Sequence, residues 1–207
     1  MIQEPVVIVA NGDFPSHKIP LLILQDANTI ICCDGAVNHL VKNGLEPHYI
    51  LGDMDSIKYS LKKKYKEQVI ELPEQDQNDL RKTIGWVEDK GVKKTIILGA
   101  TGKRDDHSLA NIFTLLQYPT SLEITIYTNH GIFSVVKGEQ KFDSFKGQKI
   151  SLFSTDSNIE ITSNNLKYNF NNNSLSSIYL GTLNESNDDF FELTISHGSL
   201  LIFQTYK

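Results

Sequence analysis

Residues 95–116 read TIILGATGKRDDHSLANIFTLL. The stretch begins with a short β-branched and apolar run, and a glycine-rich turn follows it. Apolar residues then recur at spacings of three and four, at Leu109, Ile112, Phe113 and Leu116. Such spacing places side chains on one face of a helix, so the stretch predicts a strand, a turn and a helix in succession. A chain that repeats this unit builds a parallel sheet with helices on its faces.

The unit recurs through the first 130 residues. Apolar runs predict strands at 6–10, 29–33, 49–51, 69–72, 95–98 and 122–127. Leu80, Ile84 and Val87 repeat the helical spacing between the fourth run and the fifth. This part of the chain is therefore predicted to form helices packed around a parallel sheet.

The pattern changes after residue 130. Short apolar runs at 151–153, 159–162, 192–196 and 199–204 lack helical spacing and are separated by Asn, Ser and Gly, as in an antiparallel sandwich. In the asparagine-rich tract 164–173, Leu166, Tyr168 and Phe170 alternate, which favours an ordered strand or hairpin over low complexity. We therefore predict an α/β fold in two domains: an N-terminal parallel-sheet α/β catalytic domain over 1–130, followed by a C-terminal antiparallel β-sandwich domain over 131–207.

The composition of the chain limits the binding partners and the cellular compartment that we expect for it. The chain has 207 residues and a formal net charge of −5, which argues against nucleic acid as a partner. Its longest apolar runs are too short to cross a membrane, and residues 1–5 lack the features of a secretory signal. Cys32 and Cys33 are adjacent and are the only cysteines, so no disulfide framework is available. We expect a reducing, cytoplasmic setting.

Glycines and carboxylates follow five of the predicted strands. They lie at NGD (11–13), DGA (34–36), GDMD (52–55), QD (75–76) and GATGKRDD (99–106). The carboxyl ends of parallel strands form the edge of the sheet at which ligands bind. One such turn alone carries little information, because Gly and Asp are common in turns. Five at one edge predict a ligand site, and clustered carboxylate oxygens are suited to Mg²⁺ bound to a nucleotide's phosphates.

Several of these residues have a structural alternative. Asp53 and Asp55 could converge on one cation, because Gly52 allows the backbone to turn. Alternatively, Asp55 or the serine after it could cap the following helix, but capping explains only one carboxylate, so metal binding is favoured. Asp79 could cap the helix that carries Lys82, whose side chain could reach a phosphate or remain solvated.

The stretch after the fifth strand offers the most polar groups. A glycine-rich turn that leads into a helix N-terminus can bind anions through backbone N–H groups, although the Walker A spacing is absent. Arg104 offers two parallel donors to phosphate oxygens. Asp106 is expected to cap the helix, and His107 could contact a ligand or lie at the surface.

These motifs, in this order, resemble those of the thiamine pyrophosphokinase (thiamine diphosphokinase) family. The family pattern has the segments D-G-G/A-x-N, G-D-x-D-S-I, D-Q-x-x-T-D-x-x-K and G-G-R-x-D-[HQ]. The corresponding segments here are DGAVN (34–38), GDMDSI (52–57), QDQNDLRK (75–82) and GKRDDH (102–107). A weaker likeness continues at LKY (166–168) and GTLNE (181–185). The chain departs from the pattern with Asn78 for Thr, Lys103 for the second Gly and Leu183 for Ser.

The resemblance implies an enzyme that transfers the terminal diphosphate of ATP to the hydroxyl of thiamine and releases AMP. It implies Mg²⁺ as the cofactor and a homodimer with thiamine bound at the interface. By the resemblance, Asp53, Asp55 and Asp79 are metal and catalytic residues, and Lys82, Arg104 and Asp106 are further catalytic residues. It likewise implies that a second group of residues contacts ATP or thiamine: Asp34, Gln75, Arg104, His107, Tyr168 and Asn184. Arg104 belongs to both groups.

Some assignments stay open in the sequence. The proton of the attacking alcohol could pass to Asp106 or to Asp53. Tyr168 could stack on the aminopyrimidine ring of thiamine or belong to the core of the sandwich. Two other functions compete with the kinase: a non-catalytic regulatory protein that binds a small metabolite, suggested by Leu183, and another Mg²⁺-dependent nucleotide phosphotransferase.

Overall fold

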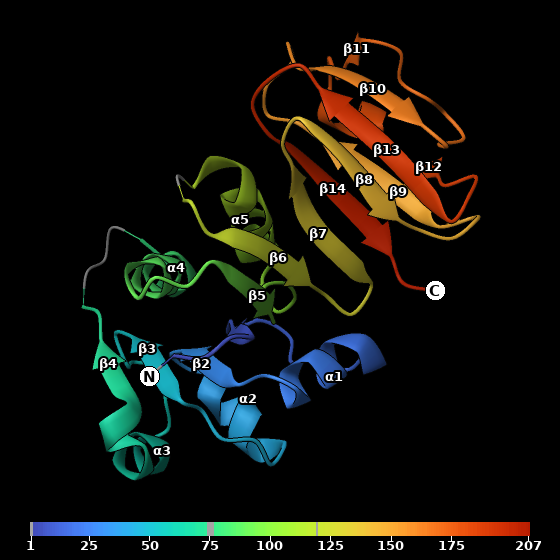
Figure 1. Cartoon of the computed structure of the whole chain (residues 1–207). Coiled ribbons are helices and arrows are strands. Elements are labelled where there is room, and N and C mark those ends of the chain that lie inside the picture. The colour runs from blue at the N-terminus through green and yellow to red at the C-terminus, as the bar shows by residue number, and fades with distance from the viewer. Residues whose placement is uncertain (1, 74–76, 119) are drawn as a thin grey trace. The chain divides into compact units, whose positions relative to one another are not determined.

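The structure is a computed structural model that describes residues 2–73, 77–118 and 120–207. The chain forms two compact units, Met1–Asn129 and His130–Lys207 (Figure 1). The first is built on parallel strands with helices, and the second contains only antiparallel strand pairs. The prediction of an α/β fold followed by an antiparallel sandwich is confirmed.

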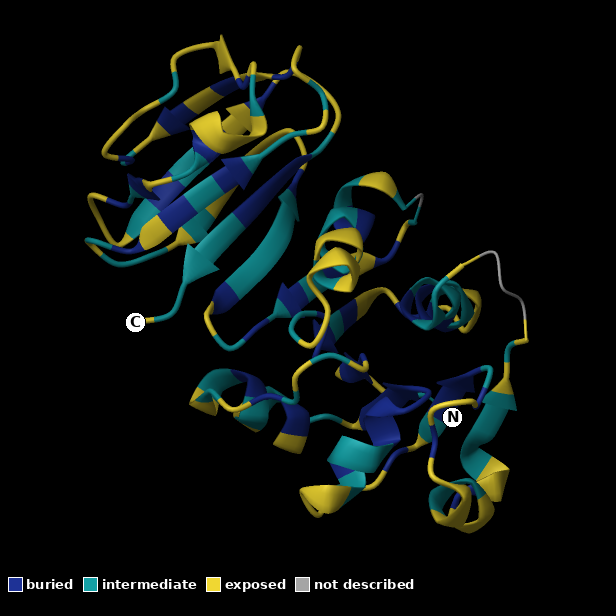
Figure 2. Cartoon of the chain, turned by 180° about the vertical axis from the view of Figure 1, so that it is seen from behind, coloured by how far each residue is buried: buried dark blue, intermediate teal, exposed yellow. Residues whose placement is uncertain are grey.

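The first unit is organised by a parallel sheet with the order β6-β5-β1-β2-β3-β4. Its strands are β1 (Val6–Val9), β2 (Thr29–Cys33), β3 (Tyr49–Gly52), β4 (Val69–Glu71), β5 (Lys94–Leu98) and β6 (Glu123–Tyr127). Every residue of β1 and β2 is buried, which explains why these strands appear as continuous apolar runs in the sequence. Figure 2 shows them in dark blue inside the unit.

Helices cover both faces of this sheet. They are α1 (Lys18–Gln25), α2 (Ala36–Lys42), α3 (Tyr59–Lys64), α4 (Asp79–Asp89) and α5 (Asp105–Gln117), with a 3₁₀ turn η1 (Lys66–Gln68). Leu24 of α1 and Leu40 of α2 join the core on the face that contains Cys32. Helix α4 packs on β2 and β3 from the other face, where the Cys33 thiol lies 3.4 Å from the Thr83 hydroxyl.

The strand order reverses direction beside β1. From β1 the chain proceeds outward through β2, β3 and β4, and then returns to place β5 on the other side of β1. Loops that leave two adjacent strands in opposite directions open a crevice at the carboxyl ends of those strands. The turns after β1 and β5 therefore lie at the position where an open α/β sheet binds its ligand.

The second unit is a sandwich of two antiparallel sheets. One has the order β12-β9-β14-β7 and the other β11-β10-β13-β8. The strands are β7 (Gly131–Val136), β8 (Glu139–Asp143), β9 (Lys149–Phe153), β10 (Glu160–Asn164), β11 (Asn173–Ser174), β12 (Asn184–Glu185), β13 (Phe190–Ile195) and β14 (Leu200–Thr205), with a 3₁₀ turn η2 (Ile178–Gly181). Inward-facing residues of both sheets, among them Leu152 and Phe191, share one core.

The asparagine-rich tract is ordered, but it is not itself a strand. It connects β10 to β11, which pair as a hairpin. Leu166 is buried and Phe170 packs against the core, whereas Tyr168 is exposed, so the three alternating residues do not share one face. Polar side chains satisfy the backbone here: the Leu166 N–H donates to the Asn169 side chain, and the Phe170 N–H donates to the Ser163 hydroxyl.

Within the described ranges, no helix has both the length and the apolar character needed to span a bilayer.

Candidate active site

A cleft of about 400 Å³ lies at the carboxyl edge of the parallel sheet. It receives residues from the ends of β1, β2 and β3, from the turn after β5, and from the first turns of α4 and α5. The predicted site residues that line it are Asp34, Asp53, Asp55, Asp79, Lys82, Arg104 and His107. Gln75 lies outside the described residues. The predicted ligand edge thus coincides with this cleft.

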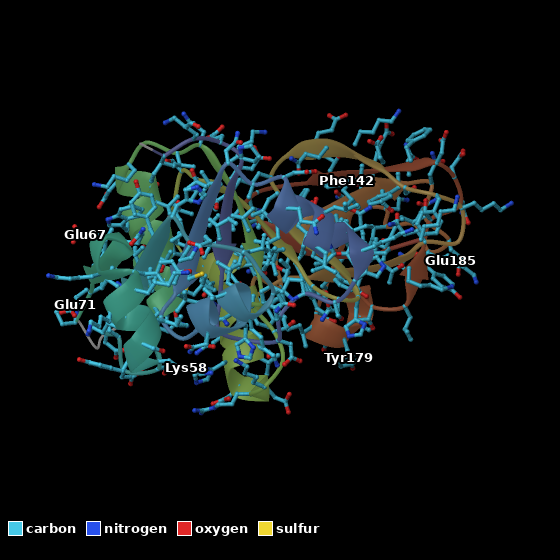
Figure 3. All side chains as sticks on the ribbon, turned by 90° about the horizontal axis from the view of Figure 1, so that it is seen from below. Lys58, Glu67, Glu71, Phe142, Tyr179 and Glu185 are labelled. Carbon is cyan, nitrogen blue, oxygen red and sulfur yellow. The ribbon has the colours of Figure 1, made fainter. Side chains whose placement is uncertain are left out.

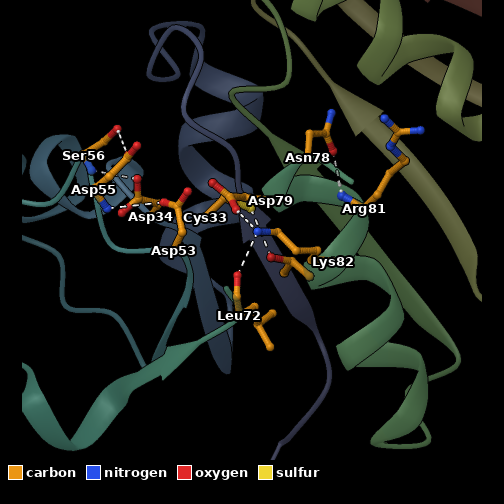
Figure 4. Close-up of polar contacts among 11 residues, drawn as sticks. Cys33, Asp34, Asp53, Asp55, Ser56, Leu72, Asn78, Asp79, Arg81 and Lys82 are labelled. Carbon is orange, nitrogen blue, oxygen red and sulfur yellow. Dashed lines mark hydrogen bonds and ion pairs between the residues drawn. The ribbon is translucent and has the colours of Figure 1, made fainter. Parts of the chain in front are cut away.

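Three carboxylates converge at one side of the cleft. Oxygen atoms of Asp34, Asp53 and Asp55 all lie within 4.8 Å of one another (Figure 4). The Asp55 N–H is 3.3 Å from Asp53 Oδ1, and the Ser56 hydroxyl donates to Asp55 Oδ1 at 2.7 Å. An all-oxygen set of this charge suits a hard divalent cation such as Mg²⁺. The alternative in which Asp55 or Ser56 caps the next helix is wrong, because α3 has Lys58 at its N-cap position.

Asp34 is the buried member of this group. Its side chain follows the last residue of β2, and Oδ2 accepts a hydrogen bond from the Ser56 N–H at 3.0 Å. Burial is the main cause that raises the pKa of Asp34, and the carboxylates of Asp55 and Asp79 act in the same direction. The fold therefore holds a carboxyl group in surroundings that disfavour its charged form.

Gly52 makes room for this arrangement. Its φ is +150°, and a Cβ added there would lie 2.8 Å from the Asp34 Cβ and 3.2 Å from the Asp79 carboxyl carbon. The carboxylates of β2 and α4 can approach the end of β3 only because this residue has no side chain.

We expect Gly52→Ala to lower the free energy of unfolding by about 2–4 kcal/mol, because backbone strain and the clash with Asp34 add. Denaturant unfolding measures the loss. Gly44→Ala is the matched control, since Gly44 also has a positive φ of +77° but no atom within 4 Å of the added Cβ. We expect the control to lose only about 1 kcal/mol. Equal losses in the two variants would show that crowding by Asp34 contributes nothing.

Asp79 and Lys82 form an ion pair in the first turn of α4, and both residues line the cleft. The Lys82 Nζ lies 2.7 Å from Asp79 Oδ1 and donates to the Leu72 carbonyl at 2.9 Å. Only 8% of the Lys82 side chain is exposed, so the ammonium is fixed in the cleft rather than solvated. Asp79 is the first residue of α4, and the expectation that it caps this helix is wrong. The cap is Asn78, whose Oδ1 accepts from the Arg81 N–H at 3.0 Å.

Arg104 lines the cleft and pairs with Asp106, which is not among the lining residues. The Arg104 guanidinium donates twice to the Asp106 carboxylate, at 2.6 and 3.1 Å, and both side chains are exposed. This pairing is the main cause that holds the pKa of Asp106 below its usual value. Asp106 does not cap α5, because Arg104 occupies the N-cap position. Exposed His107 lies in the first turn of this helix and lines the cleft.

The turn before α5 is partly closed to anions by its own contacts. The Gly102 N–H donates to the Ser108 hydroxyl, and the Arg104 N–H donates to the Gly102 carbonyl. These two backbone groups are therefore engaged within the turn. An anion at this end would meet the side chains of Lys103 and Arg104, which also line the cleft.

Sequence reasoning assigned no role to four polar residues at or beside the cleft, namely Asn11, Asn38, His39 and Lys103. The Lys103 Nζ lies 2.9 Å from the Asn11 carbonyl and 3.3 Å from His39 Nε2, which ties the turn after β5 to the turn after β1. Burial, and then the charge of Lys103, lowers the pKa of His39. Asn38 donates to the Ser56 carbonyl at 2.9 Å and so holds the loop after β3. Asn38 belongs to the DGAVN segment, whose asparagine was the available signal.

Cys33 also lines the cleft, but it is not a reactive thiol. Burial is the largest cause that raises its pKa to about 12. A thiol with this pKa has a thiolate fraction of about 10⁻⁴ at pH 8. We expect iodoacetamide at pH 8 to leave Cys33 unmodified in the folded protein and to label both cysteines in guanidinium chloride, as read by mass spectrometry. Rapid labelling of the folded protein would contradict this assignment.

The two predicted site residues of the second unit contact each other. Asn184 is buried, and its side chain accepts from the Tyr168 N–H at 3.1 Å and donates to the Tyr168 carbonyl at 2.8 Å. The Tyr168 side chain is 62% exposed, which rules out the alternative that it belongs to the sandwich core. Asn184 therefore fixes the backbone from which an exposed aromatic ring projects.

The sequence matches two family models. "Thiamin pyrophosphokinase, catalytic domain" covers residues 21–128, and "Thiamin pyrophosphokinase, substrate-binding domain" covers residues 131–203. Thiamine pyrophosphokinase of Bacillus subtilis is 31% identical over 186 residues, which are 82% of this chain and 83% of that protein. Thiamin pyrophosphokinase 1 of Caenorhabditis elegans is 31% identical over 124 residues, 55% of this chain, and the match spans only about half (51%) of that relative's length.

Solved structures show the same fold. The crystal structure of thiamine pyrophosphokinase from Bacillus subtilis aligns with a TM-score of 0.80 at 24% identity and covers 98% of this chain and 99% of that chain. Thiamin pyrophosphokinase from Candida albicans aligns with a TM-score of 0.79 at 18% identity, and the alignment covers 97% of this chain and 89% of that chain.

The fold and the cleft together define a class: α/β proteins that carry a cleft lined by charged residues at the carboxyl edge of a parallel sheet, followed in the sequence by a β-sandwich. The two family models narrow this class to one family. The chain belongs to the thiamin pyrophosphokinase family, and the resemblance inferred from its motifs is confirmed.

Proposed function

We propose that the protein is a thiamine diphosphokinase, which transfers the terminal diphosphate of ATP to the hydroxyl of thiamine and releases AMP. The observation that carries this proposal is the cleft. It sets three convergent carboxylates against a buried lysine and an exposed arginine, at the edge where the fold binds ligands. A cation site beside phosphate-binding side chains is what transfer between two polyanions requires.

The chemistry assigned to the cleft is mainly positioning and charge neutralisation. Attack of the alcohol on the β-phosphorus of ATP develops negative charge on the transferred group and on the leaving AMP. Mg²⁺, when bound, neutralises phosphate charge, and Asp53 and Asp55 are the side chains we assign to it. Lys82 is held by Asp79 and contacts the phosphates without the entropic cost of ordering a free lysine. Arg104 exchanges Asp106 for a phosphate oxygen as the substrate enters.

Asp106 is the weaker of the two candidates for the general base. Arg104 holds its pKa low, which makes the carboxylate a poor proton acceptor while the pair is intact. We therefore assign Asp106 to orienting Arg104, and Asp53 to the proton of the thiamine hydroxyl.

We assign thiamine binding to the second unit, residues 131–207, and ATP and Mg²⁺ to residues 1–130. In addition to Tyr168, the second unit exposes large hydrophobic side chains in η2 and in the turn after it: Ile178, Tyr179 (Figure 3), Leu180 and Leu183. Leu183 is 87% exposed at a φ of +63°. Exposed apolar groups of this kind are typical of an interface, which supports a homodimer with thiamine bound between subunits. Sedimentation of a monomer at micromolar concentration would contradict it.

We also propose a cytoplasmic location. Cys32 and Cys33 are both free and buried, as expected for a protein kept in a reducing compartment.

A metabolite-binding regulatory protein is the second candidate, because Leu183 replaces a polar residue of the family pattern. Calorimetry separates the two functions. If the protein is a kinase, titration with thiamine gives a heat that depends on Mg²⁺ and an unreactive ATP analogue, since transfer requires both substrates to be bound together. Thiamine binding that ignores nucleotide and metal, without turnover, would favour the regulatory protein.

A further inference from the structure

We propose that Lys103 is a further nucleotide-binding residue, whose ammonium contacts a phosphate group of ATP in addition to the contacts of Lys82 and Arg104. The inference rests on the proposed function, whose nucleotide site it extends to a residue that the family pattern does not contain. That pattern has glycine at this position, so the resemblance gives Lys103 no role.

The backbone of Lys103 adopts a conformation that suits glycine better than lysine. Its φ is +60°, in the left-handed region, directly after Gly102 with a φ of +84°. A residue with a Cβ is strained in this region, and lysine lacks the short polar side chain that makes the conformation tolerable for asparagine. The strained residue lines the cleft, and backbone strain of this kind clusters at functional sites.

The ammonium of Lys103 is held by neutral groups. Its Nζ donates to the Asn11 carbonyl at 2.9 Å and to Asn11 Oδ1 at 3.0 Å, and it lies 3.3 Å from His39 Nε2. Burial, and then the charge of Lys103, lowers the pKa of His39, so the ring is neutral at pH 7 and can accept from the ammonium. These contacts orient the lysine without neutralising its charge.

Lys103 differs in this respect from the other two cations of the cleft. Lys82 is paired with Asp79, and Arg104 with Asp106, whereas none of the ion pairs among the described residues involves Lys103. A phosphate group that reaches Lys103 therefore displaces no carboxylate. The contact replaces weak hydrogen bonds to neutral acceptors by a charge-assisted one.

A purely structural role does not account for Lys103. The turns that it joins, after β1 and after β5, are already bonded through their backbones: the Gly12 N–H donates to the Gly99 carbonyl and the Asp13 N–H to the Thr101 carbonyl, both at 2.8 Å. A Cβ added to Gly12 would lie 2.3 Å from the Thr101 carbonyl oxygen, so the two turns are in direct contact. Hydrogen bonds from an exposed lysine add little to this contact, which leaves the charge as the feature to be explained.

The test is binding of α,β-methylene-ATP, whose α–β bridge cannot be broken, to the full chain with Mg²⁺, measured by calorimetry. We expect Lys103→Met to weaken binding at least about tenfold, because a hydrogen bond between charged groups is lost. Lys103→Arg keeps the charge and should bind within about threefold of the unmodified protein. Lys42→Met is the matched control: Lys42 is exposed in the last turn of α2 and is not a cleft residue, so its loss should leave binding unchanged.

Lys103→Gly separates binding from structure. Both Lys103→Gly and Lys103→Met lose the contacts to Asn11 and His39, but glycine also relieves the strain at a positive φ. The melting temperature of Lys103→Gly should therefore equal or exceed that of Lys103→Met, while its affinity for the analogue falls as far. A lysine that only joined the two turns would lower the melting temperature in both variants and leave the affinity unchanged.

Three results would overturn the contact: unchanged affinity in Lys103→Met and Lys103→Gly, an equal loss in Lys103→Arg, or no binding of the analogue to the unmodified protein. Product formation from ATP and thiamine tests the function separately. If the unmodified protein makes thiamine diphosphate and the Lys103 variants bind the analogue normally, only this inference falls. If binding depends on the charge at residue 103 but no thiamine diphosphate forms, the proposed function falls and the contact to nucleotide phosphate stands.

Discussion

We expect Asp53→Asn to lower turnover at least about a hundredfold and to leave the fold intact. A hundredfold loss corresponds to about 2.7 kcal/mol of lost transition-state stabilisation. The loss follows from the proposed role of Asp53 at the cation and at the proton of the alcohol. Asparagine keeps the shape of the side chain and an oxygen that can accept from the Asp55 N–H, so the loop after β3 has no reason to rearrange. Steady-state turnover with saturating ATP, Mg²⁺ and thiamine measures the effect, and circular dichroism checks the fold.

Asp105→Asn is the control for this measurement, because it removes the same charge from an exposed position near the cleft. Its turnover should stay within about twofold of the unmodified protein. Near-normal turnover of Asp53→Asn would remove Asp53 from both the metal site and the proton transfer.

Lys82→Met has the second largest expected effect, and it acts on activity and stability together. Turnover should fall about a hundredfold, because a fixed cation no longer meets the transferred phosphates. The free energy of unfolding should fall by about 1–3 kcal/mol, since Asp79 loses its partner in a partly buried site. Turnover assays and denaturant unfolding measure the two losses on the same preparation.

The double variant Asp79→Asn/Lys82→Met separates these two effects. With both charges removed, most of the stability should return, because no unpaired charge remains, while turnover should stay low. Lys94→Met is a control from an exposed ion pair with Glu123 and should change neither quantity appreciably. A double variant that regains turnover would contradict the proposed contact between Lys82 and phosphate.

The alternation of strands and helices could be predicted because it depends on the spacing of apolar residues that are close in the sequence. Strands β1 and β2 are buried on both faces and stand out as continuous apolar runs. Strands β7 and β8 were not predicted. The Glu139–Asp143 strand is mostly exposed and polar, so its identity comes from pairing with β13 rather than from its own residues. The order of the parallel strands likewise depends on contacts between distant segments.

The site could be predicted as a set of residues but not as a set of contacts. Motif spacing found most of the charged residues that line the cleft, since they lie in turns after strands or in the first turns of α4 and α5. It could not show that Asn78 rather than Asp79 caps α4, because either side chain can accept the bond. Nor could it show that Asp34 is buried beside Asp53 and Asp55, which depends on how β2 and β3 pair.

The most direct test of the account is a product assay. The protein is incubated with ATP, Mg²⁺ and thiamine, and nucleotides and thiamine esters are quantified by ion-exchange chromatography. We expect AMP and thiamine diphosphate to appear in equal amounts, with no AMP when thiamine or Mg²⁺ is omitted. ADP as the only nucleotide product, or no product at all, would contradict the proposed transfer of diphosphate.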